Sequence, residues 1–173
     1  MTIQLDYTNM MAPPIDGGIS SAEWEEAGKA FTSAHHGVVD EHAAGTLGFL
    51  DLPDDRALHD QTRQFVKSLR DRGHFPTDVV VLGIGGSALG PIALRTALRP
   101  PQWNLLDEKA REGNPRLHVL DNVDPANITA LLARLDLARS LFVVTSKSGG
   151  TAETMAQYLV IRAALANALG DDE

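Results

Sequence analysis

Two segments rich in glycine and hydroxyl side chains have the composition needed to bind a phosphate group. The first, residues 83–91, follows an apolar run and reads Gly-Ile-Gly-Gly-Ser-Ala-Leu-Gly-Pro. The second, residues 145–154, follows another apolar run and reads Thr-Ser-Lys-Ser-Gly-Gly-Thr-Ala-Glu-Thr. Glycine leaves backbone N–H groups unobstructed, hydroxyls add donors, and a helix that starts after the loop adds the positive end of its dipole. Together they predict a site for a phosphorylated small molecule.

The first segment alone leaves three interpretations open. Residues 83–88 fit the dinucleotide-binding pattern G-x-G-x-x-G/A between a strand and a helix. Asp121 ends the next predicted strand, where that pattern places an acidic residue, but it lies farther along the chain than the usual ~20 residues. A tight strand-to-helix turn also favours glycine without binding anything. A plain turn, a dinucleotide site and a monophosphate site all remain.

The second segment favours a monophosphate. Ser146, Ser148 and Thr151 place three hydroxyls within six residues, and Gly149 and Gly150 leave their amides open at a predicted helix start. Such donors can surround the several acceptor oxygens of a phosphate, whereas a dinucleotide needs no hydroxyl cluster. The competing interpretation is an ordinary helix cap by Ser148 or Thr151. One cap, however, requires neither three hydroxyls nor two glycines.

Other residues with reactive side chains give weaker signals. Lys147 has two interpretations, an ammonium directed at the anion or at solvent, while Glu153 in the first helical turn is expected to cap free amides. The six histidines lack the spacing of a helical metal site, and no serine lies in a nucleophile-elbow pattern. The chain has no cysteine, which excludes disulfides and thiol catalysis. Neither a metal nor a cofactor is predicted.

The composition is that of one globular domain. The 173 residues are 43% apolar and 22% charged, enough to bury a core. The net charge of −8 argues against nucleic acid or an anionic membrane as a partner. The apolar runs are far shorter than the ~20 residues that cross a bilayer, and the N-terminus lacks the features of a signal peptide. We therefore expect a cytoplasmic location.

Residues 1–53 are predicted to form an N-terminal arm and a helix. Ser20 or Ser21 caps a helix that runs from Ala22 to about Ala34, with glutamates in its first turns, where they suit the helix dipole. Glycines and a proline over residues 37–53 predict a turn-rich connection.

Residues 54–173 are predicted to alternate helices and strands. The apolar patterns indicate strands at 79–82, 117–120 and 141–145, helices at 54–72, 90–98, 125–135 and 151–169, and exposed surface at 100–116. Continuous apolar strands separated by helices are typical of a parallel sheet covered on both faces. The predicted fold class is therefore α/β, a three-layer sandwich with a mainly parallel sheet flanked by helices, preceded by a helical N-terminal segment.

Three motifs resemble the N-terminal part of the glucose-6-phosphate isomerase family, within the sugar-isomerase (SIS) domain superfamily. They are Gly83–Pro91, the Asp-Asn-Val-Asp-Pro of Asp121–Pro125, and Ser146–Thr154. Their order and separation fit the family from about residue 78 to residue 165, while residues before 54 match poorly. The first and third motifs together are specific. The resemblance implies that residues 54–173 form an SIS-like α/β sugar-phosphate-binding subdomain that is incomplete, since the second subdomain of the family is absent.

The resemblance also implies which residues bind the substrate. In the family, the two loops hold the sugar phosphate, and many members have threonine where this chain has Gly150. The corresponding phosphate-binding residues here are Gly86, Ser87, Ser146, Lys147, Ser148 and Thr151. The family interconverts the hexose phosphates glucose 6-phosphate and fructose 6-phosphate. A carboxylate base moves a proton between C1 and C2, an arginine stabilises the enediolate, and a histidine and a lysine assist ring opening.

The family's catalytic residues come from motifs around Glu-Ser-Asn-Gly and Gly-Gln-His, and neither occurs in these 173 residues. We therefore expect an N-terminal fragment of a glucose-6-phosphate isomerase that carries the phosphate-binding loops, no catalytic residue, and no activity by itself. The full-length protein is expected to be a homodimer. Two alternatives remain, a non-catalytic sugar-phosphate-binding SIS domain and a dinucleotide-binding domain that uses Gly83, Gly85 and Ala88.

Overall fold

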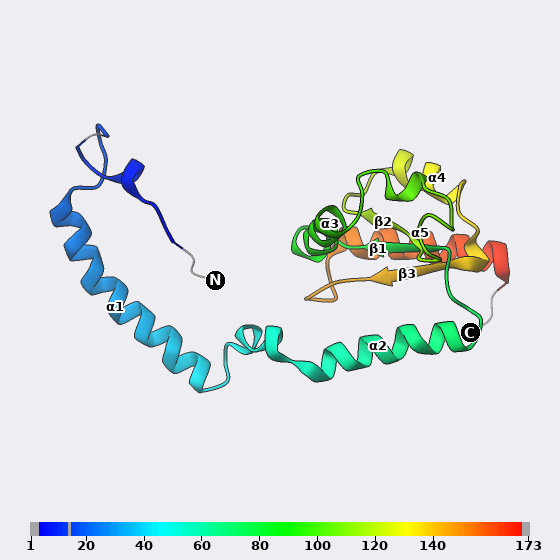
Figure 1. The fold of residues 1–173 in the computed structure, drawn as a ribbon, viewed down its shortest axis with the longest axis horizontal. Helices are drawn as coiled ribbons and strands as arrows, with labels where there is room; N and C mark the ends of the chain where they lie inside the picture. The colour runs from blue at the N-terminus through cyan, green and yellow to red at the C-terminus, as the bar shows by residue number, and fades with distance from the viewer. Residues whose placement is uncertain (1–3, 14, 171–173) are drawn as a thin grey trace. The chain divides into compact units, whose positions relative to one another are not determined.

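A computed structural model describes residues 4–13 and 15–170 (Figure 1). The chain divides into two compact units, Met1–Asp60 and Gln61–Glu173. The division lies inside helix α2 (Arg56–Asp71). The presence of α2 confirms the helix predicted at 54–72. The domain boundary predicted between residues 53 and 54 stays a prediction.

One long helix, α1 (Ser21–Ala43), dominates the first unit. It begins at a capping box, in which Ser20 N donates to Glu23 Oε2 over 2.8 Å and Glu23 N donates to Ser20 Oγ over 3.3 Å. The predicted end near Ala34 is wrong. An interior glycine such as Gly37 costs a helix only about 1 kcal/mol, so α1 continues to Ala43. Gly45, whose φ is +76°, follows the C-cap and prevents further helix. Short 3₁₀ turns flank α1: η1 (Thr8–Met10), η2 (Gly48–Leu50) and η3 (Leu52–Asp54).

The second unit contains a three-stranded parallel sheet. Its strands are β1 (Asp78–Leu82), β2 (Arg116–Leu120) and β3 (Ser140–Val144). The strand order is β2-β1-β3, which makes β1 the central strand. The register aligns the last residues of all three strands. The three predicted strands are confirmed, and each begins one residue earlier than predicted.

Helices cover both faces of this sheet. Helix α3 (Gly86–Leu98) connects β1 to β2, and helix α4 (Pro125–Leu132) connects β2 back across β1 to β3. Because these two connections run in opposite directions along the sheet and both are right-handed, the two helices lie on opposite faces. Helix α5 (Ala152–Leu169) shares the face of α4, because both contribute to one buried core. That core consists of Val80, Leu82, Leu120, Ile128 and Ile161. The predicted three-layer α/β sandwich is confirmed.

Helix α3 starts earlier than predicted. The sequence predicts a start at Gly90 with Pro91 in the first turn, but the helix begins at Gly86 and Pro91 lies inside it. A proline in a helix lacks the N–H that would donate to the carbonyl four residues earlier, here that of Ser87. The loss is confined to one hydrogen bond near the helix start, so the helix tolerates it. Helix α4 is shorter than predicted and ends at Leu132.

The segment 100–116, predicted to be surface, contributes buried side chains. Trp103 and Arg111 are only 7% and 6% exposed. Trp103 Nε1 donates to the carbonyl of Pro115 over 3.0 Å, and Arg111 Nε donates to the carbonyl of Asn114 over 3.1 Å. The charged stretch is thus held by its own side chains against β2. In the described part of the chain, no helix is long and apolar enough to cross a membrane.

Candidate phosphate-binding site

Both predicted phosphate loops lie at the carboxyl edge of the sheet, after the neighbouring strands β1 and β3 (Figure 1). The chain leaves β1 for α3 on one face and leaves β3 for α5 on the other face. Such a point, where neighbouring connections diverge, forms the crevice in which open α/β sheets bind ligands. A hydrogen bond joins the two loop origins, since Thr145 N donates to the carbonyl of Leu82 over 2.8 Å.

The first loop leaves backbone donors free. Gly85, the N-cap of α3, has φ +55° and ψ −123°, a conformation that favours glycine. A Cβ on Gly83 would lie 3.0 Å from the Cβ of Ser87, so the loop also requires glycine for close packing. Among the described residues, the amides of Gly85 and Gly86 and the hydroxyl of Ser87 make no hydrogen bond. These donors precede or open α3, where its dipole favours an anion.

The second loop organises its hydroxyls around its glycines. Ser146 Oγ accepts from Gly149 N over 3.0 Å, and Ser148 Oγ accepts from Gly150 N over 3.3 Å. Ser148 Oγ also lies 3.4 Å from Thr151 Oγ1. A hydroxyl that accepts a hydrogen bond still has its own proton to donate. The prediction that Gly149 and Gly150 leave their amides open is therefore wrong, because the loop's own serine oxygens accept from both. The Ser146 O–H makes no hydrogen bond among the described residues.

The helix-cap interpretation does not account for these hydroxyls. Thr151 occupies the N-cap position of α5, but its side chain makes no capping hydrogen bond. Ser148 bonds an amide inside the loop rather than one in the first turn of α5. The predicted capping by Glu153 is wrong, because this side chain makes no hydrogen bond among the described residues. The capping-box position is the third helical residue, which is Thr154.

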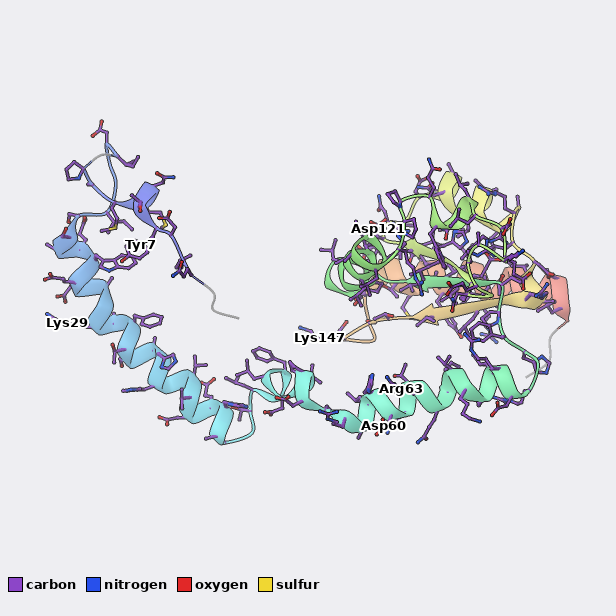
Figure 2. The ribbon with its side chains drawn as sticks, in the orientation of Figure 1. Tyr7, Lys29, Asp60, Arg63, Asp121 and Lys147 are labelled. Carbon is purple, nitrogen blue, oxygen red and sulfur yellow. The ribbon has the colours of Figure 1, made fainter. Side chains whose placement is uncertain are left out.

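Lys147 and Asp121 belong to this edge of the sheet (Figure 2). Lys147 is exposed at the turn of the loop after β3. Asp121 is exposed directly after β2, the strand next to β1, which is where a dinucleotide-binding fold places its acidic residue. Loop geometry therefore fits both a monophosphate and a dinucleotide. No group of three His, Asp or Glu side chains that could hold a metal occurs within residues 4–13 and 15–170.

One buried side chain at this edge was missed by sequence analysis. Gln157 of α5 is 0% exposed, and its Nε2 donates to the carbonyls of Leu120 (3.2 Å) and Asn122 (3.0 Å). These carbonyls belong to the end of β2 and the loop that follows it. A glutamine within an alanine-rich helix carries no signal that distinguishes a buried amide from a solvated one.

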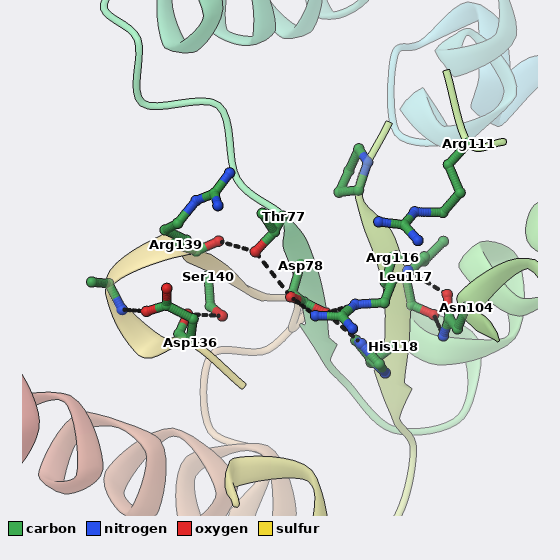
Figure 3. A network of polar contacts seen from close by, with 12 residues as sticks. Thr77, Asp78, Asn104, Arg111, Arg116, Leu117, His118, Asp136, Arg139 and Ser140 are labelled. Carbon is green, nitrogen blue, oxygen red and sulfur yellow. Dashed lines mark hydrogen bonds and ion pairs between the residues drawn. The ribbon is translucent and has the colours of Figure 1, made fainter. Parts of the chain in front are cut away.

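The opposite, amino edge of the sheet holds a saturated charge cluster (Figure 3). The side chain of Asp78 is 0% exposed. Its carboxylate accepts from Arg116 Nε and Nη2 over 2.7 and 2.6 Å, from His118 Nε2 over 2.9 Å and from Thr77 Oγ1 over 3.1 Å. Burial alone would raise the pKa of Asp78, but these hydrogen bonds hold that pKa below its ordinary value. The same contact raises the pKa of Arg116.

The sheet order, the helix layers and the loops at the strand switch point define a doubly wound α/β protein of the sugar-isomerase type. Residues 46–173 match the model of a family described as phosphoglucose isomerase. The chain belongs to this family.

Curated relatives agree with the family match. The chain is 39% identical over 169 residues to a glucose-6-phosphate isomerase of Rubrobacter xylanophilus, covering 98% of this chain and 37% of that protein. It is 34% identical over 171 residues to the glucose-6-phosphate isomerase of Carboxydothermus hydrogenoformans, covering 98% and 36%. The chain therefore spans just over a third of the length of these relatives.

A solved structure supports the fold. The crystal structure of a hypothetical protein from Thermus thermophilus superposes with a TM-score of 0.62 at 34% sequence identity. The match covers 84% of this chain and 32% of that chain.

Proposed function

We propose that this chain supplies the phosphate-binding loops of an isomerase that interconverts glucose 6-phosphate and fructose 6-phosphate, a step of glycolysis and gluconeogenesis. Family membership supports the reaction. One observation supports the binding role above the others: the hydroxyls of the second loop make no helix-capping hydrogen bond, and in the first loop the amides of Gly85 and Gly86 make no hydrogen bond among the described residues.

Local donors, rather than the overall charge, attract the phosphate in this proposal. The chain carries a net charge of −8, so its long-range field repels an anion. Amide and hydroxyl donors at two helix starts offset that repulsion at short range, and the Lys147 ammonium adds a positive charge. The proposed phosphate-binding residues are Gly86, Ser87, Ser146, Lys147, Ser148 and Thr151.

We assign no catalytic residue within the 173 residues. Isomerisation requires a base that moves a proton between C1 and C2 and a group that stabilises the oxyanion formed next to the carbonyl. The donors at the carboxyl edge are suited to holding the phosphate end of the sugar, and the sugar carbons extend away from them. The chain alone is therefore proposed to bind hexose phosphates without turning them over.

Calorimetry on the purified 173-residue chain tests this proposal. We expect saturable binding of fructose 6-phosphate and glucose 6-phosphate, weaker binding of inorganic phosphate, no heat with NAD, and no turnover in a coupled isomerase assay. NAD binding without fructose 6-phosphate binding would replace the proposal with a dinucleotide site. Robust isomerisation by the purified chain would contradict the absence of a catalytic residue.

We also propose a cytoplasmic location and a homodimeric full-length protein. The location rests on the glycolytic reaction proposed above, because a chain without cysteine fits reducing and oxidising compartments equally. The dimer rests on the family resemblance. The negative net charge argues against nucleic acid or an anionic membrane as a partner. Light scattering on the full-length protein measures the assembly directly.

A further inference from the structure

Three segments of the carboxyl edge meet at one oxygen atom. The carbonyl of Leu120, the last residue of β2, accepts from Gly83 N of the first loop over 3.3 Å. The same carbonyl accepts from Gln157 Nε2 over 3.2 Å. Gln157 also bonds the carbonyl of Asn122 over 3.0 Å, in the loop after β2. Helix α5, which begins directly after the hydroxyl loop, is thereby tied to both other loops.

The chemistry of the contact fixes which end of the amide makes it. Both partners of Gln157 are backbone carbonyls, which only accept hydrogen bonds, so the NH₂ group must face them. The remaining oxygen, Gln157 Oε1, is buried and has no hydrogen-bond partner among the described residues. The amide is therefore incompletely satisfied in a fully buried position.

Burying an incompletely satisfied amide in a core is unfavourable. A buried polar group without a partner loses its hydration without compensation, and Gln157 sits one helical turn from Ile161, which is apolar and 2% exposed. An apolar side chain at position 157 would fill similar space without burying the unpaired Oε1, but it would take the Gln157 donor away from the carbonyl of Asn122. What only the amide provides is a directional link from α5 to two specific carbonyls.

We propose that Gln157 is a positioning residue for the phosphate site, which holds the first loop, the loop after β2 and helix α5 in one arrangement. Gln157 acts through the Leu120 carbonyl, whose position sets that of Gly83 and hence of the free amides at Gly85 and Gly86. It does not touch the ligand. The inference rests on the proposed function, because the arrangement matters for binding only if these loops hold a phosphate.

The test compares Gln157→Met with Ile161→Val in the 173-residue chain. Methionine keeps the length of the side chain but cannot donate, while the valine variant weakens the same helix's core without touching a loop. Gln157→Asn, an amide one methylene shorter, gives an intermediate case and carries the test if the methionine variant does not fold. Calorimetry with fructose 6-phosphate gives the affinity, thermal unfolding gives the stability, and NMR hydrogen exchange reports on the Gly83 amide.

We expect Gln157→Met to weaken fructose 6-phosphate binding about tenfold, as for loss of one or two buried hydrogen bonds, and to accelerate exchange of the Gly83 amide. Gln157→Asn should fall between it and the parent chain, and Ile161→Val should lower the melting temperature with unchanged affinity. Unchanged affinity in Gln157→Met overturns the proposal. So does weakening in both Gln157→Met and Ile161→Val that follows stability alone.

Failure of the proposed function would look different. If the parent chain binds no phosphorylated ligand, the phosphate site itself is refuted. The exchange measurement then decides whether Gln157 holds the loops. Faster exchange of the Gly83 amide in Gln157→Met but not in Ile161→Val supports the positioning role, and equal exchange in both overturns it.

Discussion

The two edges of the same sheet differ in how far their polar groups are paired by hydrogen bonds. At the amino edge, Asp78 is fully buried and its carboxylate is saturated by a bidentate arginine, a histidine and a threonine. At the carboxyl edge, the amides of Gly85 and Gly86 make no hydrogen bond among the described residues, and both glycines and Lys147 are exposed. The buried charge at the amino edge is fully paired, whereas the carboxyl edge keeps unpaired donors and an exposed charge.

This contrast separates stability from function within one small fold. The Asp78 carboxylate is buried and already accepts four hydrogen bonds, so its charge does not mark a ligand site. The exposed amides of Gly85 and Gly86 contribute no intramolecular hydrogen bond among the described residues to the stability of the unliganded protein. Substitutions at the two edges should therefore affect different measurements.

The largest effect is expected for Asp78→Asn. Removing one partner of a buried, hydrogen-bonded ion pair costs about 3 kcal/mol or more, so the free energy of unfolding in urea should fall by about that amount. The matched control is Asp71→Asn, which removes an exposed pair with Lys67 whose side chains are 59% and 75% exposed. That change should cost less than about 1 kcal/mol. Equal losses in the two variants would remove the distinction.

A smaller and opposite pattern is expected for two serines, Ser148 in the loop after β3 and Ser140 at the start of β3. Ser148→Ala should weaken fructose 6-phosphate binding about tenfold, with stability changed by less than about 0.5 kcal/mol. Ser140→Ala deletes a hydroxyl that donates to the carbonyl of Asp136 over 2.7 Å. It should lower stability slightly and leave affinity unchanged. Calorimetry measures the affinity and urea unfolding measures the stability of both variants. An affinity loss in Ser140→Ala would contradict the expected pattern.

The smallest expected effect is a difference in pH dependence between the stability contributed by Asp78 and the binding of the phosphorylated ligand. The pKa of Asp78 lies below its ordinary value of 3.8, so its stabilisation is complete above that value and is lost as pH falls through the lower native pKa. On the same descent in pH, binding should weaken earlier, near pH ~6, where a phosphate monoester takes up a proton and loses its second negative charge. Urea unfolding of the parent chain and Asp78→Asn should therefore converge only in strong acid. Convergence near pH ~6 would contradict the assignment.

Sequence patterns predicted the elements with local signatures. Four-residue apolar runs located the strands at 79–82 and 141–145, and a largely apolar stretch that contains His118 located the one at 117–120. The alternation with helices predicted the parallel sheet, because a strand buried on both faces needs apolar residues at successive positions. Helix boundaries were less accurate, and Pro91 shows why. Proline is favoured in the first turn of a helix but is also tolerated a turn later, so it does not mark the start.

Contacts between distant residues could not be predicted. Asp78 and His118 are separated by 40 positions, and only the strand register brings them together. The link from Gln157 to Leu120 spans 37 positions and depends on the packing of α5 against the sheet. The composition of the two loops predicted their chemistry, since glycine and hydroxyl content is local. The binding roles of their residues stay predictions.

The strand order also sets a sequence of events in time. Central strand β1 precedes both of its neighbours in the chain, so during synthesis it emerges with neither edge paired. Strand β2 arrives first and brings the Leu120 carbonyl to Gly83, whereas the bond from Thr145 to Leu82 must wait for β3. Each step has to overcome the entropy cost of closing a long loop before its strand contacts contribute stability. The carboxyl edge of the sheet is therefore completed last, when β3 joins the other two strands.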